Sequence, residues 1–140
     1  MQRITGTSAR NLERAISRGD YPDLCPELDQ NLARAWFGDS THFAAVEYPG
    51  LYPVHLRSAK VALRSCWVAP SLRGQRLRED LLTARLTWAG QWDIALLRVV
   101  VAEPLVQWWL DRGWASRESL PAAAWSAGQL RRVLERPLRE

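Results

Sequence analysis

Three arginines surround a glycine in the stretch SLRGQRLRED, where an apolar run gives way to a helix-like pattern. Arg73, Arg76 and Arg78 supply guanidinium groups, and Gly74 permits a tight turn in which backbone N–H groups can face a ligand. The first turn of a helix adds unpaired N–H groups and a partial positive charge. The pattern favours binding of an anion, although the two acidic residues that follow in the helix could instead neutralise the arginines.

Acid–base chemistry has few candidates in this sequence. They are Glu47, His42, His55 and Glu103. Glu47 and His55 lie on expected strands, and either could act as a general base, directly or through a water. Both residues could equally be structural or face solvent. Cys66 has no histidine at a readable spacing, so a nucleophilic role is disfavoured.

The composition indicates one ordinary domain, residues 1–140. The chain has 47% hydrophobic residues and a net charge of +4, and Lys60 is its only lysine. The arginines are scattered, without the clustered basic stripe of a nucleic-acid face.

Cys25 and Cys66 belong to no metal-binding cluster, so ordinary thiols and no metal site are predicted. No segment approaches the ~18 apolar residues of a membrane span, and no leader pattern opens the chain, so a soluble, cytoplasmic protein is expected.

Hydrophobic periodicity and turn residues divide the chain into helices and strands. A first helix should open at Thr7 or Ser8 and end at Gly19. The other helices are predicted over 27–38, 77–90, 104–113 and, behind a capping box of Ser126 and Gln129, the C-terminal segment 126–140. Strands are predicted over 41–48, within 52–68 and over 92–101, with a short strand or loop from Trp114.

Several of these segments together resemble a known family. A strand ending in WVAPSLRGQRL, a helix, a buried strand and then EPLVQWWLDRGW are similar to the GNAT superfamily of acyl-CoA-dependent N-acyltransferases, over roughly Ser58 to Ala115. The resemblance implies an α/β (α+β) fold, a mixed central β-sheet flanked by helices. The family usually ends in a seventh strand, whereas the C-terminal segment here is predicted to be a helix. We therefore expect a sheet that is shortened or completed by a partner.

The resemblance also implies a reaction, transfer of an acyl group from acetyl-CoA or another acyl-CoA to an amine acceptor. The family's phosphate-binding loop, Gln/Arg-x-x-Gly-x-Gly/Ala, falls on residues 71–76, where Gly74 matches and Ser71 and Arg76 differ. Glu47 and His55 remain the catalytic candidates. The expected coenzyme A-binding residues are Trp67, Val68, Arg73, Gly74, Gln75, Arg76, Leu77 and Arg78.

Three other positions depart from the family's usual residues. Arg64 falls where a carboxylate base is often found, Trp109 where a tyrosine protonates the leaving thiolate, and Ala102 where an asparagine is frequent. A second hypothesis is therefore an inactive GNAT-like protein, phage-encoded or accessory, that binds a protein partner through its tryptophans or its arginine-rich tail. Whether Trp108 and Trp109 face a groove or solvent should discriminate between the two hypotheses.

Two further expectations concern partners. Nucleic-acid binding through the terminal helix is disfavoured because acidic residues dilute its basic patch. A homodimer is possible because GNAT-like domains often dimerise. The basic residues of that helix are Arg131, Arg132, Arg136 and Arg139.

Overall fold

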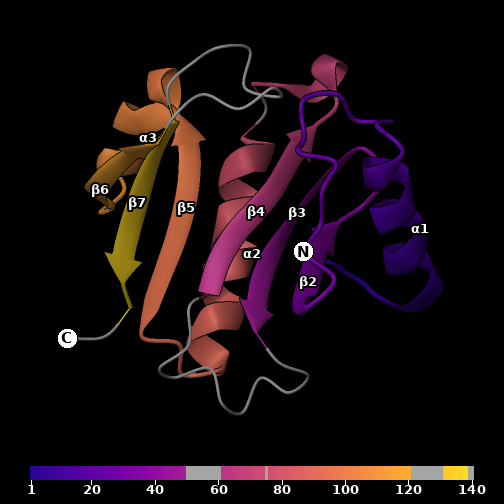
Figure 1. Ribbon diagram of the computed structural model, residues 1–140, viewed down its shortest axis with the longest axis horizontal. Coiled ribbons are helices and arrows are strands. Elements are labelled where there is room, and N and C mark those ends of the chain that lie inside the picture. Colours follow the sequence, from indigo (N-terminus) through magenta and orange to yellow (C-terminus); the bar gives the residue numbers. More distant parts are fainter. Residues whose placement is uncertain (50–60, 75, 121–130, 139–140) are drawn as a thin grey trace.

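The computed structural model describes residues 1–49, 61–74, 76–120 and 131–138, and within them seven strands form one mixed sheet. The strand order is β1-β2-β3-β4-β5-β7-β6, and helices α1 and α2 lie on opposite faces of the sheet (Figure 1). This arrangement confirms the predicted α/β fold class. The strands are β1 (Arg3–Ile4), β2 (Leu32–Gly38), β3 (His42–Pro49), β4 (Val61–Val68), β5 (Leu96–Ala102), β6 (Ala115–Leu120) and β7 (Arg131–Pro137). The helices are α1 (Gly6–Ser17), α2 (Leu77–Gln91) and α3 (Val106–Leu110), with 3₁₀ turns η2 (Pro70–Leu72) and η3 (Glu103–Leu105).

The helix predicted over residues 27–38 is wrong, because Leu32–Gly38 is strand β2. Its apolar residues alternate between the two faces of the sheet: Trp36 joins the core beneath α1, whereas Ala35 and Phe37 join the core beneath α2. A strand buried on both faces has apolar residues at every position, so its pattern can be mistaken for a helical one. Pairing with β1 and β3 decides between the two.

The β2–β3 hairpin depends on a glycine. Gly38 has φ +115°, and a Cβ at this position would lie 2.1 Å from the carbonyl oxygen of His42. The carboxylate of Asp39 closes the turn by accepting hydrogen bonds from the backbone N–H and the hydroxyl of Thr41. The hairpin fixes the register that places Arg34 opposite Glu47.

Strand β4 contains a bulge. Phe43 pairs with Trp67 and Ala45 pairs with Arg64, so two residues of β4, 65 and 66, stand opposite one residue of β3. Ser65 has φ 57°, which is uncommon for a residue other than glycine. A bulge turns the backbone of the extra residue out of the regular ladder and bends the strand.

Strands β4 and β5 run parallel but pair over a short length. The pairs are Val61 with Leu97 and Ala62 with Arg98, after which the strands diverge toward their carboxyl ends (Figure 1). On its opposite edge, β5 pairs with β7 in the antiparallel direction. The divergence opens the sheet at its centre, next to the start of α2.

The predicted terminal helix and shortened sheet are also wrong. Residues 131–137 form β7, which is inserted between β5 and β6 and is antiparallel to both. Val133 and Leu134, which were expected on one helical face, are both buried, at 4% and 0% exposure. Ser126 and Gln129 of the predicted capping box lie outside the described residues. The seventh strand typical of the family is therefore present.

The remaining helices agree with the sequence predictions in their positions. Helix α1 begins at Gly6 after the cap residue Thr5, slightly before the predicted start. Helices α2 and α3 lie within one to three residues of the predicted bounds, whereas β5 begins at Leu96 rather than at residue 92. None of the described helices combines the length and apolar character that crossing a membrane requires.

Candidate functional site

A cavity of about 600 Å³ opens where β4 and β5 diverge. Its walls come from β4 from Ala62 onward, the carboxyl half of β5, the start and the third turn of α2, Trp109 of α3, and residues 23–25. Among the described residues that line it, six are arginines and one, Asp23, is a carboxylate. The cavity is therefore strongly cationic and suited to an anionic ligand. The arginines are Arg64, Arg73, Arg78, Arg85, Arg98 and Arg131.

The predicted anion loop lies at one end of this cavity, although not all of its residues line it. Arg73 lines the cavity, donates from Nε to the carbonyl oxygen of Val68 at 3.0 Å, and pairs with Asp23 at 3.2 Å. Arg78 also lines the cavity and makes no hydrogen bond or ion pair with any described residue. Two guanidinium groups thus lie at the start of α2, one of them without a partner among the described residues.

The other loop residues lie differently. Arg76 adopts a left-handed conformation with φ 62° immediately before α2, at the position where the GNAT family has glycine or alanine. Gly74 also has a positive φ, 91°, with open space around it. Leu77 packs against the core beneath α2, and Gln75 lies outside the described residues. The backbone geometry thus fits a residue without a side chain at position 76, while the sequence supplies an arginine.

Trp67 and Val68, the predicted contacts on β4, both line the cavity. The Trp67 ring stacks on Phe43 with centroids 5.5 Å apart and meets the edge of Tyr21 at 4.8 Å. Packing on both neighbours holds the indole in one orientation. Trp67 is therefore a fixed part of the wall.

Arg85 of α2 is a cavity residue that the sequence analysis missed. Its side chain is 1% exposed, its Nε donates to the carbonyl oxygen of Leu81 at 3.1 Å, and its Nη2 has no hydrogen-bond partner. Burial lowers the pKa of this guanidinium, Cys66 opposes that shift, and the positive charge of Arg78 adds to it. One signal was available, because Leu81 and Trp88 place position 85 on the buried face of an otherwise apolar helix stripe.

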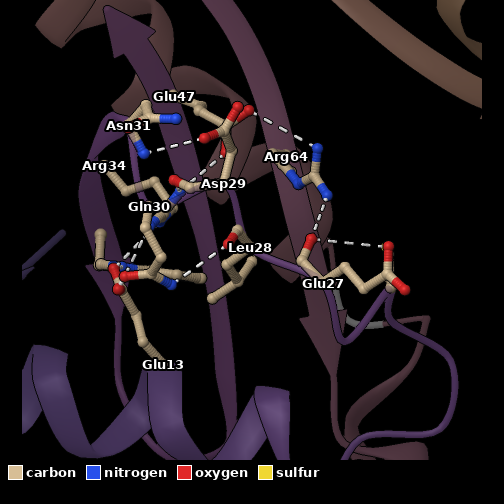
Figure 2. A network of polar contacts seen from close by, with 11 residues as sticks. Glu13, Glu27, Leu28, Asp29, Gln30, Asn31, Arg34, Glu47 and Arg64 are labelled. Atoms are coloured by element: carbon tan, nitrogen blue, oxygen red, sulfur yellow. Dashed lines mark hydrogen bonds and ion pairs between the residues drawn. The ribbon is translucent and has the colours of Figure 1, made fainter. Parts of the chain in front are cut away.

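The predicted base Glu47 does not line this cavity. It is 6% exposed, its Oε2 accepts a hydrogen bond from Nη1 of Arg34 at 2.9 Å, and its Oε1 lies 3.6 Å from Nη1 of Arg64 (Figure 2). Both carboxylate oxygens are thus engaged by guanidinium groups. The other predicted base, His55, lies outside the described residues. The catalytic roles of Glu47 and His55 stay predictions.

Arg34 is the centre of the network that holds Glu47. It also donates from Nε to Glu13 of α1 at 3.1 Å (Figure 2). Glu13 accepts a further hydrogen bond from Nε1 of Trp36 at 2.7 Å. Burial pulls the pKa of Arg34 down, but hydrogen bonds and charges from Glu13 and Glu47 together raise it above its ordinary value. The network joins α1 to β2, β3 and β4.

The tryptophan pair of α3 points in two directions. Trp109 is 5% exposed and lines the cavity, whereas Trp108 is partly buried and carries the guanidinium of Arg112 over its ring at 3.7 Å. Arg112 in turn pairs with Glu79 of α2 and lowers the pKa of that carboxyl. Ala102 and Arg64, the other positions that depart from the family pattern, also line the cavity.

No family model and no curated protein matches this sequence, so the comparisons rest on solved structures. One is a presumed phosphinothricin N-acetyltransferase, 18% identical, with a TM-score of 0.64 over 99% of this chain and 98% of that one. Another is a presumed acyl-CoA N-acyltransferase from Klebsiella pneumoniae, 20% identical, with a TM-score of 0.59 over 99% and 96%. The N-acetylglutamate synthase from Neisseria gonorrhoeae, complexed with coenzyme A and N-acetyl-glutamate, is 14% identical, with a TM-score of 0.62 over 99% of this chain and 35% of that one.

These structures define the class of fold. The chain has the acyl-CoA N-acyltransferase fold of the GNAT superfamily, and the resemblance predicted from the sequence is confirmed at that level. The cavity between β4 and β5 is the feature of this fold on which a function can be built.

Proposed function

We propose that this protein is an acyl-CoA-dependent N-acyltransferase that transfers an acyl group to an amine. The observation that carries the proposal is the cationic cavity between the diverging strands β4 and β5, with Arg73 and Arg78 at the start of α2. A helix start with unpaired N–H groups and nearby guanidinium groups suits a pyrophosphate. The structural neighbours, which include acetyltransferases, support acyl transfer as the general chemistry.

The chain's own residues can be given roles in this reaction. Arg73, Arg76 and Arg78 would bind the phosphates of coenzyme A, while Trp67 and Val68 would line the path of its arm along β4. The bulge at residues 65 and 66 turns backbone groups out of the ladder, where they can polarise the thioester carbonyl. The amine then attacks that carbon, a C–N bond forms, the C–S bond breaks, and coenzyme A leaves as a thiolate.

The proton lost by the attacking ammonium needs an acceptor. Asp23 is the described carboxylate that lines the cavity, and it is paired with Arg73. We retain Glu47 and His55 as candidate bases, acting directly or through water. Replacement of Glu47 by glutamine should change the pH dependence of turnover if Glu47 is the base, and only the stability if its role is structural.

Calorimetric titration with coenzyme A and acetyl-CoA tests the proposal. We expect micromolar binding by the native protein and a loss of at least tenfold in the Arg73→Glu/Arg78→Glu double variant, because each reversal replaces a cation that faces the phosphates. Arg10→Glu/Arg14→Glu, at two exposed positions of α1, is the charge-matched control and should bind as the native protein does. Absence of binding at millimolar ligand by the folded native protein would overturn the proposal.

The alternative is a GNAT-like protein that has lost catalysis and binds a protein partner. The replacements at Arg64, Ala102 and Trp109 favour it, as does the exposed side chain of Leu96 on β5, at 37%. The position of Trp109 in the cavity wall favours a small ligand instead. Failure of the titration above would turn the search to a partner.

A further inference from the structure

Arg85 is a buried charge for which the described protein supplies no counter-charge. Its side chain is 1% exposed, its Nε bonds within its own helix to Leu81, and its buried Nη2 has no hydrogen-bond partner. No described carboxylate forms an ion pair with it, and the charged group that acts on it from α2, Arg78, is also positive. A buried guanidinium without a counter-charge lowers the stability of the fold unless another group, such as a bound anion, neutralises it.

The position of Arg85 indicates where that partner would come from. Its side chain forms part of the wall of the cavity between β4 and β5, close to Cys66 in the β4 bulge. Arg78 lies seven residues earlier on the same face of α2, about 10 Å along the helix axis. The cavity thus has a first cationic point at the start of the helix and a second one deeper, beneath the bulge.

These two points suit two different anions. Arg78 belongs with the loop that would bind the phosphates, and the bulge is where the thioester carbonyl would lie under the proposed function. An anion that reaches Arg85 therefore lies beyond the thioester. A carboxylate suits this guanidinium, because its oxygens accept charged hydrogen bonds such as the one that Nη2 can still donate, and its negative charge balances that of Arg85.

We propose that Arg85 binds a carboxylate at the end of the acyl group, so that the donor is the coenzyme A thioester of a dicarboxylic acid. This inference rests on the proposed function, because it requires acyl-CoA to occupy the cavity. The transfer itself is unchanged: the amine forms an amide with the thioester carbon, the C–S bond breaks, and the coenzyme A thiolate and one proton are released. The distal carboxylate takes no part in bond making and stays bound to Arg85.

Succinyl-CoA and butyryl-CoA test the inference, because their acyl chains have the same number of carbons and differ in the terminal carboxylate. We expect the native protein to bind succinyl-CoA at least tenfold more tightly than butyryl-CoA, the size of effect given by one charged hydrogen-bonded contact. In Arg85→Met this preference should disappear, while the affinity for free coenzyme A should stay within twofold of the native value. Arg85→Lys should retain part of the preference.

The outcomes separate the two proposals. If neither free coenzyme A nor any of its thioesters binds, both the proposed function and this inference are overturned. If succinyl-CoA and butyryl-CoA bind the native protein equally, the function stands and the inference is overturned, whatever the folding behaviour of the variants. If Arg85→Met weakens free coenzyme A as much as succinyl-CoA, Arg85 recognises phosphate and the inference is likewise overturned.

A carboxylate could also belong to the amine acceptor, and a further arm distinguishes this source. Glutamate is titrated into the protein saturated with coenzyme A and compared with 4-aminobutanamide, in which the α-carboxylate is absent and the side-chain carboxylate is replaced by an amide. Binding of glutamate that depends on Arg85, without any preference for succinyl-CoA, would overturn the assignment to the acyl group. We expect the native protein to prefer succinyl-CoA, and we expect glutamate to bind equally well to the native protein and to Arg85→Met.

Discussion

Two buried arginines lie on opposite faces of the same sheet, and their surroundings differ completely. Arg34 on β2 is 3% exposed and pairs with Glu13 and Glu47, whereas Arg85 on α2 is 1% exposed and has no carboxylate partner among the described residues. Accordingly the pKa of Arg34 is raised and that of Arg85 is lowered. A buried charge with carboxylate partners from two other elements holds the fold together, while one without such a partner among the described residues, in a cavity wall, is suited to a ligand.

The first prediction concerns the ion pairs of Arg34 and has the largest expected effect. Arg34→Met should lower the free energy of unfolding by about 3 kcal/mol, because it leaves the buried carboxylate of Glu47 with only the more distant Arg64. Urea denaturation followed by circular dichroism measures the change. Arg14→Met on the exposed face of α1 is the control.

The double variant Arg34→Met/Glu47→Leu sharpens the interpretation. Removing both charges should recover a large part of the lost stability, because no uncompensated group then remains buried. A loss below about 1 kcal/mol in the single variant, typical of an exposed ion pair, would show that the network contributes little to the fold.

The second prediction concerns Arg85, and here we expect the substitution to raise the free energy of unfolding. Without ligand, Arg85→Met should raise the free energy of unfolding by about 2 kcal/mol, because an apolar side chain of similar length replaces an unpaired buried charge. Arg85→Lys keeps the charge and should give no such gain. A stability of Arg85→Met equal to or below that of the native protein would mean that the guanidinium is already satisfied in solution.

The third prediction is the smallest and concerns backbone strain next to the cavity. Arg76→Gly should raise the free energy of unfolding by about 0.5 kcal/mol, because glycine adopts the left-handed conformation of this residue without steric cost. The gain is small because glycine also gives the unfolded chain more conformational freedom. Arg76→Ala removes the same charge without relieving the conformation and should be neutral or destabilising. Thermal unfolding at matched pH compares the two variants, and equal melting temperatures would contradict the strain.

If the phosphate role of Arg76 is correct, both variants at this position should also bind coenzyme A more weakly, by a similar factor. The protein would then hold an arginine in a strained conformation for the sake of its charge. Unchanged affinity in Arg76→Gly would assign the phosphates to Arg73 and Arg78 alone.

Local signals were enough to predict several elements of the fold. The broad apolar stripe of residues 77–90 and the glycines that end helices identified α1, α2 and α3, because helices form from contacts three and four residues apart. The same signals failed for β2 and β7. Both are strands paired on each side, and their apolar residues at 35–37 and 133–134 fit a helical face as well as a strand buried on two faces.

For the candidate site, the sequence by itself determined the kinds of residue available: the arginine-glycine loop before a helix, Trp67 and Val68 at the end of a strand, and Trp109 in the position of the usual tyrosine. Only the tertiary structure decided which of them face one cavity. It turned Glu47 away into an ion-pair network and brought Arg85 beneath the β4 bulge, beside residues distant in sequence. The physical reason is that burial and ion pairing depend on where strands diverge and which faces helices cover, and those are set by long-range strand pairing rather than by neighbouring residues.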